Sequence, residues 1–254
     1  MAIAWQKEVN GTYYQVRTAG SSVRLYTDGV FHSQYNQRTK ISGGIWDLLM
    51  IPAFLHRPQE LKRILVLGVG GGAVLRMFLD HFSPESITGI ELNPTHIRVA
   101  RKFFGLNNRK IELVEQDAVT WLKLYKGPPF DLVIDDLFGE QDGEPIRAVE
   151  ADIHWGKLVS KNLSASGLLI CNFLSRKEIC QSGFSKLFFN DEKFKSAWIF
   201  ENHRYDNQIA VFSGLNTVLS DLYEQIKQIS KSNSALRLSC KNFTVNKLKC
   251  RHAT

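Results

Sequence analysis

The sequence predicts an α/β fold, in which short apolar strands alternate with amphipathic helices around a mostly parallel sheet. A run of apolar residues at 64–67 is followed by a cluster of glycines and then by helical apolar spacing over 73–82. A second apolar run, 87–91, ends in Glu91, and the same alternation continues along the chain. A strand, a glycine turn, a helix and an acidic strand end are typical of Rossmann-like nucleotide-binding folds.

The glycine turn is the first candidate binding element. Glycine lacks a Cβ, so the backbone N–H groups of such a turn can approach a ligand closely. The turn is formed by Gly68, Gly70, Gly71 and Gly72. Glu91 follows about 20 residues later, where folds of this type hold ribose hydroxyls. The alternative is a tight strand-to-helix turn that binds no ligand.

Seven strands are expected in the α/β part, in the order 64–67, 87–91, 111–114, 130–135, 167–173, 197–201 and 208–212. Helices are expected at 94–104, 118–125, 149–163, 182–190 and 215–229. Asn93 and Pro94 predict the start of the first of these helices, as N-cap and first helical residue.

The first part of the chain predicts a small antiparallel unit. Its β-prone runs at 13–18, 23–27 and 30–35 are separated by turn residues. An apolar helix over 45–55 follows, with Pro52 as a kink or early stop. We therefore divide the chain into a β-hairpin unit (1–43), a nucleoside-binding α/β domain (44–215) and a C-terminal helix with a basic tail (216–254).

Composition indicates an ordinary soluble protein of the cytoplasm. Of the 254 residues, 44% are hydrophobic and 22% are charged. No signal peptide is recognisable, and no apolar run approaches the ~20 residues that span a membrane. The four cysteines, at positions 171, 180, 240 and 250, have no Cys-x-x-Cys spacing. They favour reduced thiols over a metal site or a disulfide framework.

The net charge of +7 comes from the C-terminal segment, which has no acidic residue from Gln225 onwards. A basic tail can dock on nucleic acid or on an acidic partner. Because the tail contains few aromatic residues, we favour a solvated surface over a nucleic-acid site.

Polar residues follow four strands of the predicted sheet, and ligands of open α/β sheets bind at the carboxyl ends of strands. Glu91 can accept hydrogen bonds from two ribose hydroxyls. Asp117 is placed to bind an adenine amino group, although an N-cap role is nearly as well supported. The candidate binding residues beside these two acids are Leu92, Gln116, Ala118 and Asp135.

The glycine turn also limits the type of nucleotide. It lacks the Lys-Ser/Thr of a mononucleotide phosphate loop, and its Gly-x-Gly-Gly-Gly order differs from the dinucleotide Gly-x-Gly-x-x-Gly. A sulfonium nucleoside such as S-adenosylmethionine needs the ribose acid but no phosphate cradle. That ligand fits the pattern best.

Four segments together resemble the spermidine synthases, which are polyamine aminopropyltransferases on the class I methyltransferase fold. They are 66–76, 91–93, 116–118 and 130–136. Residues 25–31 and the helix over 45–55 are similar to the β-hairpin domain of that family. The resemblance covers roughly residues 10 to 215.

The resemblance implies a role for each matched residue. The glycine turn and Glu91 would hold S-adenosylmethionine or its decarboxylated form, and Asp117 would bind adenine. Asp136 would be the base that deprotonates an attacking amine, because only a neutral amine has a lone pair for the displacement. Asp135 or Glu140 would be an auxiliary. No metal is expected, and a homodimer through the N-terminal unit is plausible for the family.

The chain departs from the family pattern at several motif positions, so that most groups expected to hold a diamine are missing. Gly71 and Gly139 stand where the family has aspartates, and His32 stands where it has glutamine. A Tyr-His-Glu motif is not visible; Trp46 and Asp47 lie in that region. Without an aspartate at position 71, we expect S-adenosylmethionine to bind at least as well as its decarboxylated form.

Two rival functions remain open beside aminopropyl transfer. One is an S-adenosylmethionine-dependent methyltransferase, and the other is a non-catalytic binding protein on the same fold. An acidic segment after the fourth strand favours a cationic amine substrate, or is simply a solvated loop: Asp135, Asp136, Glu140, Asp142, Glu144, Glu150 and Asp152. His32, His154 and His203 show no metal-ligand spacing, and we interpret them as structural or surface residues.

Overall fold

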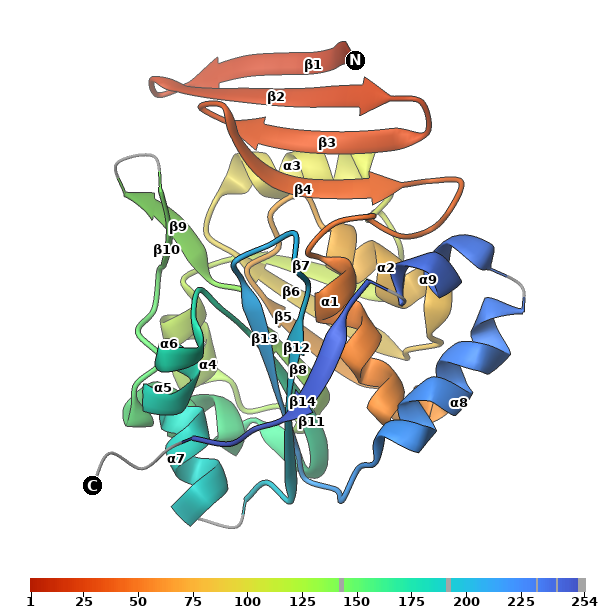
Figure 1. The fold of residues 1–254 in the computed structure, drawn as a ribbon. Coiled ribbons are helices and arrows are strands. Elements are labelled where there is room, and N and C mark those ends of the chain that lie inside the picture. Colours follow the sequence, from red (N-terminus) through yellow and green to blue (C-terminus); the bar gives the residue numbers. More distant parts are fainter. Residues whose placement is uncertain (142–143, 191–192, 232, 241, 251–254) are drawn as a thin grey trace.

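A computed structural model describes residues 1–141, 144–190, 193–231, 233–240 and 242–250 (Figure 1). Its central feature is an eight-stranded sheet with the order β14-β12-β13-β11-β8-β5-β6-β7. Strands β7, β6, β5, β8 and β11 are parallel neighbours, and β13, β12 and β14 continue the sheet through antiparallel pairs. The strands span Arg63–Leu67 (β5), Ser86–Glu91 (β6), Ile111–Glu115 (β7), Phe130–Asp135 (β8), Leu163–Phe173 (β11), Ser196–Glu201 (β12), Gln208–Ser213 (β13) and Thr244–Lys247 (β14).

The mostly parallel α/β sheet confirms the predicted fold class, and each of the seven expected strands is present. The eighth strand, β14, comes from the segment that we predicted as a basic tail. It pairs with β12 over four residues and extends the antiparallel edge. The division of the chain into three domains stays a prediction.

Helices cover both faces of the sheet, and each face has its own apolar core. One core packs the sheet against α1, α2, α3, α8 and α9, and the other packs it against α4 to α7. The helices span Asp47–Met50 (α1), Ala73–His81 (α2), Pro94–Phe103 (α3), Ala118–Leu124 (α4), Ile153–Lys161 (α5), Arg176–Gln181 (α6), Gly183–Asn190 (α7), Leu219–Ser230 (α8) and Ser234–Ser239 (α9). The four apolar residues of β5 from Ile64 to Leu67 have no exposed surface, as expected for a strand buried on both faces.

Local sequence signals explain where several helices begin and end. The Asn93 side chain accepts hydrogen bonds from the backbone of Thr95 and His96, which confirms the predicted cap of α3. The helix expected over 45–55 changes after α1 into a 3-10 segment, Ile51–Leu55 (η1), which contains Pro52. A second short 3-10 segment, Pro58–Glu60 (η2), precedes β5. In the segment expected as a loop after β8, Phe138–Gln141 (β9) and Glu144–Arg147 (β10) pair as a hairpin.

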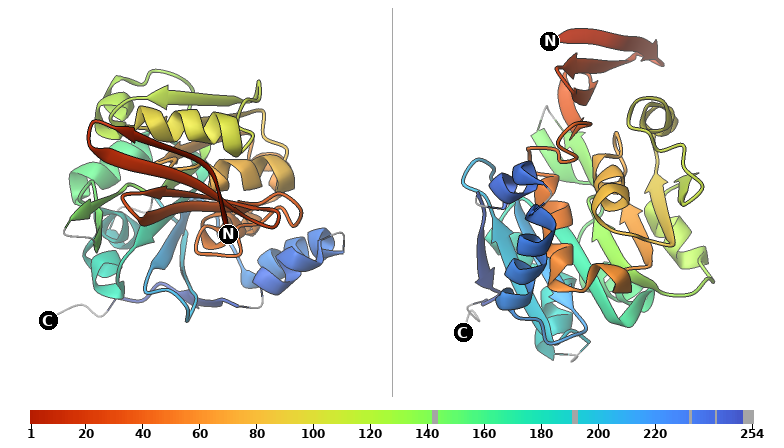
Figure 2. Two further views of the ribbon diagram at one scale, coloured as in Figure 1. Left: turned by 90° about the horizontal axis from the view of Figure 1, so that it is seen from above. Right: turned by 90° about the vertical axis from the view of Figure 1, so that its right-hand side faces the viewer.

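The N-terminal unit is a separate four-stranded antiparallel sheet above the α/β body (Figure 2). Its strands are Ala2–Val9 (β1), Thr12–Ala19 (β2), Ser22–Thr27 (β3) and Val30–Asn36 (β4). We expected the last three of these strands but not β1. The β1 residues are mostly exposed on both faces, so the alternation that marks a half-buried strand is absent from its sequence.

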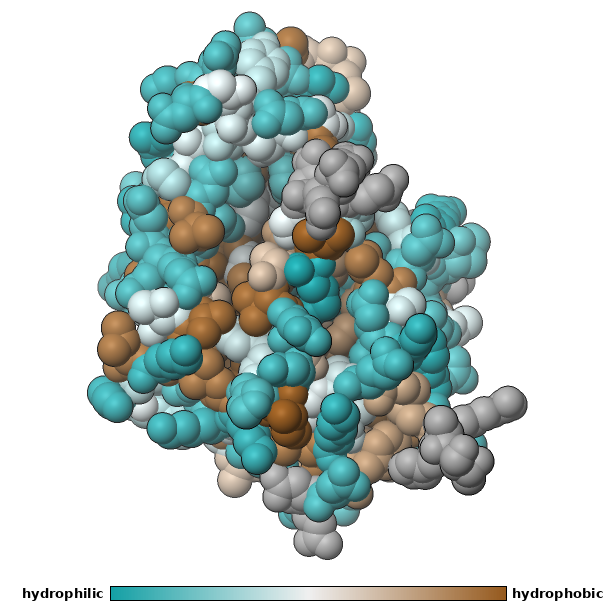
Figure 3. Space-filling model, turned by 90° about the vertical axis from the view of Figure 1, so that its left-hand side faces the viewer, coloured by the Kyte–Doolittle hydropathy of each residue, from teal (hydrophilic) through white to brown (hydrophobic). Residues whose placement is uncertain are grey.

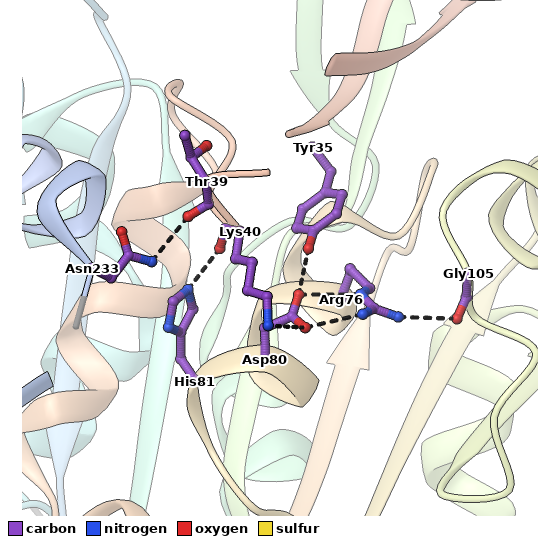
Figure 4. Close-up of polar contacts among 8 residues, drawn as sticks. All are labelled: Tyr35, Thr39, Lys40, Arg76, Asp80, His81, Gly105 and Asn233. Carbon is purple, nitrogen blue, oxygen red and sulfur yellow. Dashed lines mark hydrogen bonds and ion pairs between the residues drawn. The ribbon is translucent and has the colours of Figure 1, made fainter. Parts of the chain in front are cut away.

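A polar network attaches this sheet to the body (Figure 4). Asp80 on α2 accepts hydrogen bonds from the Tyr35 hydroxyl and from two nitrogens of Arg76, at 3.1 and 3.0 Å for the arginine. The His81 ring bonds the carbonyl of Lys40 at 2.6 Å, and Lys40 approaches Asp80 to 3.9 Å. The end of β4 is therefore fixed to α2, which starts at the glycine turn.

The cysteine prediction was wrong for one pair. Cys180 on α6 and Cys250 form a disulfide, which ties the segment after β14 to the body. Cys171 and Cys240 are free. The two bonded cysteines are 70 residues apart in sequence, so no local spacing indicated their pairing. Among the described residues, no helix is long and apolar enough to cross a membrane.

Candidate active site

The glycine turn lies at the carboxyl end of β5, and its shape depends on the absence of side chains. Gly68 has a φ of +85°, and a Cβ there would lie 2.2 Å from the carbonyl oxygen of Asp136. Gly70 and Gly72 also have positive φ. Gly68 therefore allows the end of β8 to approach the turn, which brings Asp136 beside the predicted nucleoside site.

The carboxylate of Glu91, at the end of β6, binds the backbone of the glycine turn through hydrogen bonds. Its Oε2 accepts hydrogen bonds from the backbone N–H of Val69 at 3.0 Å and of Gly70 at 2.8 Å. Its Oε1 accepts one from the N–H of Asn93 at 2.9 Å. Since a carboxylate has about four acceptor positions, capacity remains on Glu91 for a ligand hydroxyl.

Most of the predicted binding residues surround one cavity of about 630 Å³. Figure 3 shows the face of the molecule on the side of the β9–β10 hairpin, where hydrophilic residues predominate over the N-terminal sheet and hydrophobic residues are interspersed with hydrophilic ones on the body below. The cavity is lined by strand ends, by the β1–β2 turn and by the β9–β10 hairpin. The predicted residues among its walls are Gly68, Glu91, Leu92, Gln116, Asp117 and Ala118. A cavity of this size is in the range of small-molecule sites.

The end of β7 provides the polar wall of the cavity. Asp117 is the N-cap of α4, where its Oδ1 accepts hydrogen bonds from the N–H and hydroxyl of Thr120 at 2.8 and 2.7 Å. These bonds lower the pKa of the Asp117 carboxyl. The capping role that we weighed for Asp117 is therefore present. Leu92, which also lines the cavity, exposes 70% of its surface, which is unusual for leucine and leaves an apolar face for a ring.

The two aspartates at the end of β8 have different surroundings. Asp135 is fully buried, and its Oδ2 accepts hydrogen bonds from Arg147 at 2.7 Å and from the Trp155 indole at 2.9 Å. Asp136 is partly exposed, and its Oδ1 accepts a hydrogen bond from the Asn172 amide at 2.8 Å. Neither aspartate lines the cavity. Asp136 lies beside it, because Leu137, the next residue in the chain, and Gly68, which packs against the Asp136 carbonyl, are both lining residues.

The pKa of Asp136 is raised to about 7, chiefly because its carboxyl group is buried although the residue as a whole is partly exposed, and burial disfavours the carboxylate. The nearby charge of Asp135 raises this pKa further, while the hydrogen bond from Asn172 and the charge of Arg147 lower it. A carboxyl group with a pKa near 7 can both accept and release a proton at neutral pH.

A pair of histidines beside Glu91 was not recognised from the sequence. The rings of His32 and His96 lie 5.1 Å apart, and His96 Nδ1 is 3.8 Å from Glu91 Oε1. The pKa of each histidine is lowered to about 4, chiefly by burial, and for His32 the nearby His96 contributes to the lowering. Both imidazoles are therefore neutral at pH 7. In the sequence, the Asn93 cap already explained the start of the helix that carries His96, so nothing marked this histidine as a site residue. In the structure His96 lines the cavity and lies beside Glu91.

The positions of the two missing family aspartates differ in the space around them. A Cβ at Gly71 would lie 2.7 Å from both the Phe104 ring and the Ser33 side chain, so this glycine is packed against its neighbours. Gly139 lines the cavity, and no atom of the described residues lies within 4 Å of a Cβ placed there. The side chain of Glu140 and the whole of Asp142 lie outside the described residues.

Asp47 lies outside the residues that line the cavity. It is buried, with hydrogen bonds from the N–H of Ser42 at 2.7 Å, the N–H of Gly43 at 3.0 Å and the Ser239 hydroxyl at 2.7 Å. These contacts fix the start of α1 to α9. Within the described residues, no group of three or more His, Cys, Asp or Glu side chains is arranged to hold a metal ion.

A family model described as the spermine/spermidine synthase domain matches residues 47–181, which is more than half of the chain. The chain belongs to the spermine/spermidine synthase family. The matched region contains the glycine turn, Glu91, Asp117 and Asp136, and it supplies most of the cavity lining; the lining residues Val9, Asn10, Thr12 and Tyr14 lie outside it.

Curated relatives in the family include two bacterial enzymes. Polyamine aminopropyltransferase 2 of Caldanaerobacter subterraneus is 32% identical over 106 residues, which cover 41% of this chain and 35% of that protein. The polyamine aminopropyltransferase of Chromobacterium violaceum is 28% identical over 137 residues, or 53% of this chain and 51% of that protein. The matches thus span between a third and a half of these relatives.

Solved structures agree on the fold. A probable spermidine synthase from Corynebacterium glutamicum superposes with a TM-score of 0.70 at 16% identity, covering 93% of this chain and 95% of that chain. Spermidine synthase from Thermotoga maritima gives a TM-score of 0.68 at 18% identity, covering 96% and 84%. Human methyltransferase-like protein 13 gives 0.54 at 18% identity, covering 82% and 93%. The class I methyltransferase-like fold is thereby confirmed.

Proposed function

We propose that this protein is a transferase that moves an aminopropyl group from decarboxylated S-adenosylmethionine to an amine acceptor. The observation that supports it most is the placement of Asp136, a carboxyl group with a raised pKa, beside the cavity that Glu91 and the glycine turn border. The family relatives are named polyamine aminopropyltransferases, which supports the same reaction.

In the proposed complex the nucleoside occupies the cavity. Glu91 accepts a hydrogen bond from a ribose hydroxyl, while Gly68, the one glycine of the predicted turn that lines the cavity, keeps the backbone close to the ligand. The adenine lies on the exposed face of Leu92, between Gln116 and Ala118, and Asp117 offers its remaining acceptor capacity to the amino group.

In the proposed reaction Asp136 takes a proton from the ammonium form of the acceptor. The neutral amine then attacks the carbon next to the sulfonium, so that a carbon–nitrogen bond forms and the carbon–sulfur bond breaks. The bonding pair returns to sulfur, and methylthioadenosine leaves as a neutral thioether. We assign Asp135 a supporting role, because it is fully buried and bonded to Arg147 and Trp155.

Product analysis tests this function. Purified protein is incubated with decarboxylated S-adenosylmethionine and a panel of mono-, di- and polyamines, and the nucleoside product is identified by mass spectrometry. Methylthioadenosine that forms only when an amine is present, and that is lost in Asp136→Asn, supports aminopropyl transfer. No methylthioadenosine with any acceptor overturns it.

Methyl transfer is the second candidate, and Gly71 favours it. An aspartate at this position would repel the carboxylate of S-adenosylmethionine, whereas Gly71 carries no charge and has no room for one. S-adenosylhomocysteine produced from S-adenosylmethionine identifies this reaction in the same assay. Nucleoside binding without any product identifies the third possibility, a non-catalytic protein. We also propose a homodimer through the N-terminal sheet, which sedimentation analysis tests.

A further inference from the structure

Arg147, the last residue of β10, connects the hairpin to the ends of two strands of the main sheet. Its Nη2 donates to Asp135 Oδ2 at 2.7 Å, and its Nη1 donates to the backbone carbonyl of Asn172 at 2.5 Å. Its Nε donates to the carbonyl of Val149 at 3.2 Å, just after the hairpin. One guanidinium therefore joins β10, the end of β8 and the end of β11.

This contact is buried. The Arg147 side chain is 9% exposed and the Asp135 side chain is not exposed at all. The guanidinium also lies over the Phe173 ring at 5.0 Å and approaches the Phe138 ring at 5.9 Å. Burying an ion pair costs so much desolvation that it adds little net stability, whereas removing one partner is strongly unfavourable. Stability alone is therefore a weak explanation for this pair.

The residue that Arg147 holds is the one that orients Asp136. Asn172 donates its side-chain N–H to Asp136 Oδ1 at 2.8 Å, and its amide oxygen accepts a hydrogen bond from Asn207 at 3.1 Å. This second bond fixes which end of the Asn172 amide faces Asp136. The position of Asp136 Oδ1 thus depends on the Asn172 backbone, which Arg147 restrains.

We propose that Arg147 is a positioning residue, which holds Asp136 through Asn172 and Asp135 and fixes the β9–β10 hairpin as a wall of the nucleoside cavity. The catalytic consequence rests on the proposed function. The positional claim does not, because it concerns contacts within the unliganded protein.

Charge adds a second effect of Arg147 on Asp136. The charged groups that face Asp136 are Asp135 from β8, Glu91 from β6 and Arg147 from β10. The two acids raise the pKa of Asp136, and Arg147 lowers it. Cys171, buried beside the ion pair, stays a neutral thiol because burial raises its pKa.

Carboxyl NMR of the purified full chain tests the proposal without a substrate. The variants are Arg147→Met, Arg147→Lys and the double variant Asp135→Asn/Arg147→Met, with Asp136→Asn to assign the resonance. Arg63→Met is the matched control. Arg63 is also partly buried and lies over an aromatic ring, that of Phe130 at 5.4 Å, but it sits at the opposite end of β5. The second readout is hydrogen exchange of the Ala148 amide, which donates to the Leu137 carbonyl at 2.9 Å beside the hairpin.

We expect Arg147→Met to raise the pKa of Asp136 from about 7 to about 8 or higher. Arg147→Lys keeps the charge and therefore a pKa near 7, but it cannot reach both Asp135 and the Asn172 carbonyl, so exchange at Ala148 becomes at least tenfold faster. The double variant leaves no unpaired buried charge and should fold even if Arg147→Met does not. It should also show fast exchange, with an Asp136 pKa near the original value.

Unchanged exchange at Ala148 in the double variant, or an unchanged Asp136 pKa in a folded Arg147→Met protein, overturns the proposal. The same changes in Arg63→Met overturn it too, since they would be a general effect of losing a buried arginine. Absence of transferase activity in the unmodified protein contradicts the proposed function alone, because both readouts here are made without substrate.

Discussion

At the scale of single residues, the two adjacent aspartates at the end of β8 lie in different surroundings. Side chains alternate along a strand, so Asp135 points into the core, whereas the side chain of Asp136, the next residue, is directed toward the Asn172 amide at the end of β11. Asp135 accepts hydrogen bonds from Arg147 and Trp155. Asp136 accepts one from the Asn172 amide and is partly exposed. From the sequence we predicted both aspartates as catalytic, but we did not distinguish their surroundings. The partners of Asp135, Arg147 and Trp155, lie in segments without a recognisable motif.

Replacement of Asp136 by asparagine should lower kcat by roughly 100- to 10,000-fold, the range for loss of a general base. Nucleoside affinity should change little, because Asp136 does not line the cavity. In the unmodified protein kcat/KM should rise with pH and level off above about 7, since the carboxylate is the active form. A pH profile that is flat from 5 to 8 would contradict Asp136 as the base.

Glu91→Gln should weaken nucleoside binding by about 10- to 100-fold, as expected for losing charge-assisted hydrogen bonds. It should also lower the free energy of unfolding by about 1–3 kcal/mol, because two N–H groups of the glycine turn depend on the carboxylate. Glu115→Gln is the matched control, as Glu115 is an exposed carboxylate paired with Glu91 across β6 and β7. Calorimetry and denaturant unfolding measure both effects; equal behaviour of the two variants would refute the role of Glu91.

At the scale of elements, prediction succeeded where the signals were local. The apolar runs of β5 and β8, the cap at Asn93 and the glycine turn each depend on neighbouring residues, and each was placed correctly. Strand β14 and the β9–β10 hairpin were missed. These three strands have four residues each and are largely polar, and their formation depends on a partner strand rather than on their own pattern. The hairpin matters most, because it forms a wall of the cavity.

Gly71→Ala tests the packing of the glycine turn against its neighbours. The added methyl group would lie 2.7 Å from Phe104 and Ser33, so we expect a loss of about 1–3 kcal/mol in unfolding free energy from overpacking. Gly139→Ala is the control in the second position that departs from the family pattern, and it should cost less than about 0.5 kcal/mol because the space is open. Equal unfolding midpoints for the two variants would show that position 71 can accommodate a side chain.

At the scale of the whole molecule, contacts distant in sequence hold the parts together. The N-terminal sheet is attached through Tyr35 and Asp80, and the C-terminal segment through β14 and the Cys180–Cys250 disulfide. Composition and charge indicated neither attachment. Residues 216–254 were predicted as a helix and a basic tail, and the pairing of β14 with the sheet edge is a long-range contact that no motif reports.

Thiol counting tests the disulfide. Under denaturing, non-reducing conditions the protein should expose two reactive thiols, from Cys171 and Cys240, and four after reduction. Cys180→Ser should lower the unfolding free energy by about 2–4 kcal/mol, whereas Cys240→Ser should have a smaller effect. Four reactive thiols before reduction would show that Cys180 and Cys250 are not bonded.

The most direct test of the account is calorimetric titration of the protein with methylthioadenosine, S-adenosylmethionine and decarboxylated S-adenosylmethionine. We predict one nucleoside bound per chain, with S-adenosylmethionine binding at least as well as its decarboxylated form. Binding should be weakened by Glu91→Gln and retained by Asp136→Asn. A clear preference for the decarboxylated form would contradict the inference from Gly71, and no binding of any of the three would contradict the assignment of the cavity as a nucleoside site.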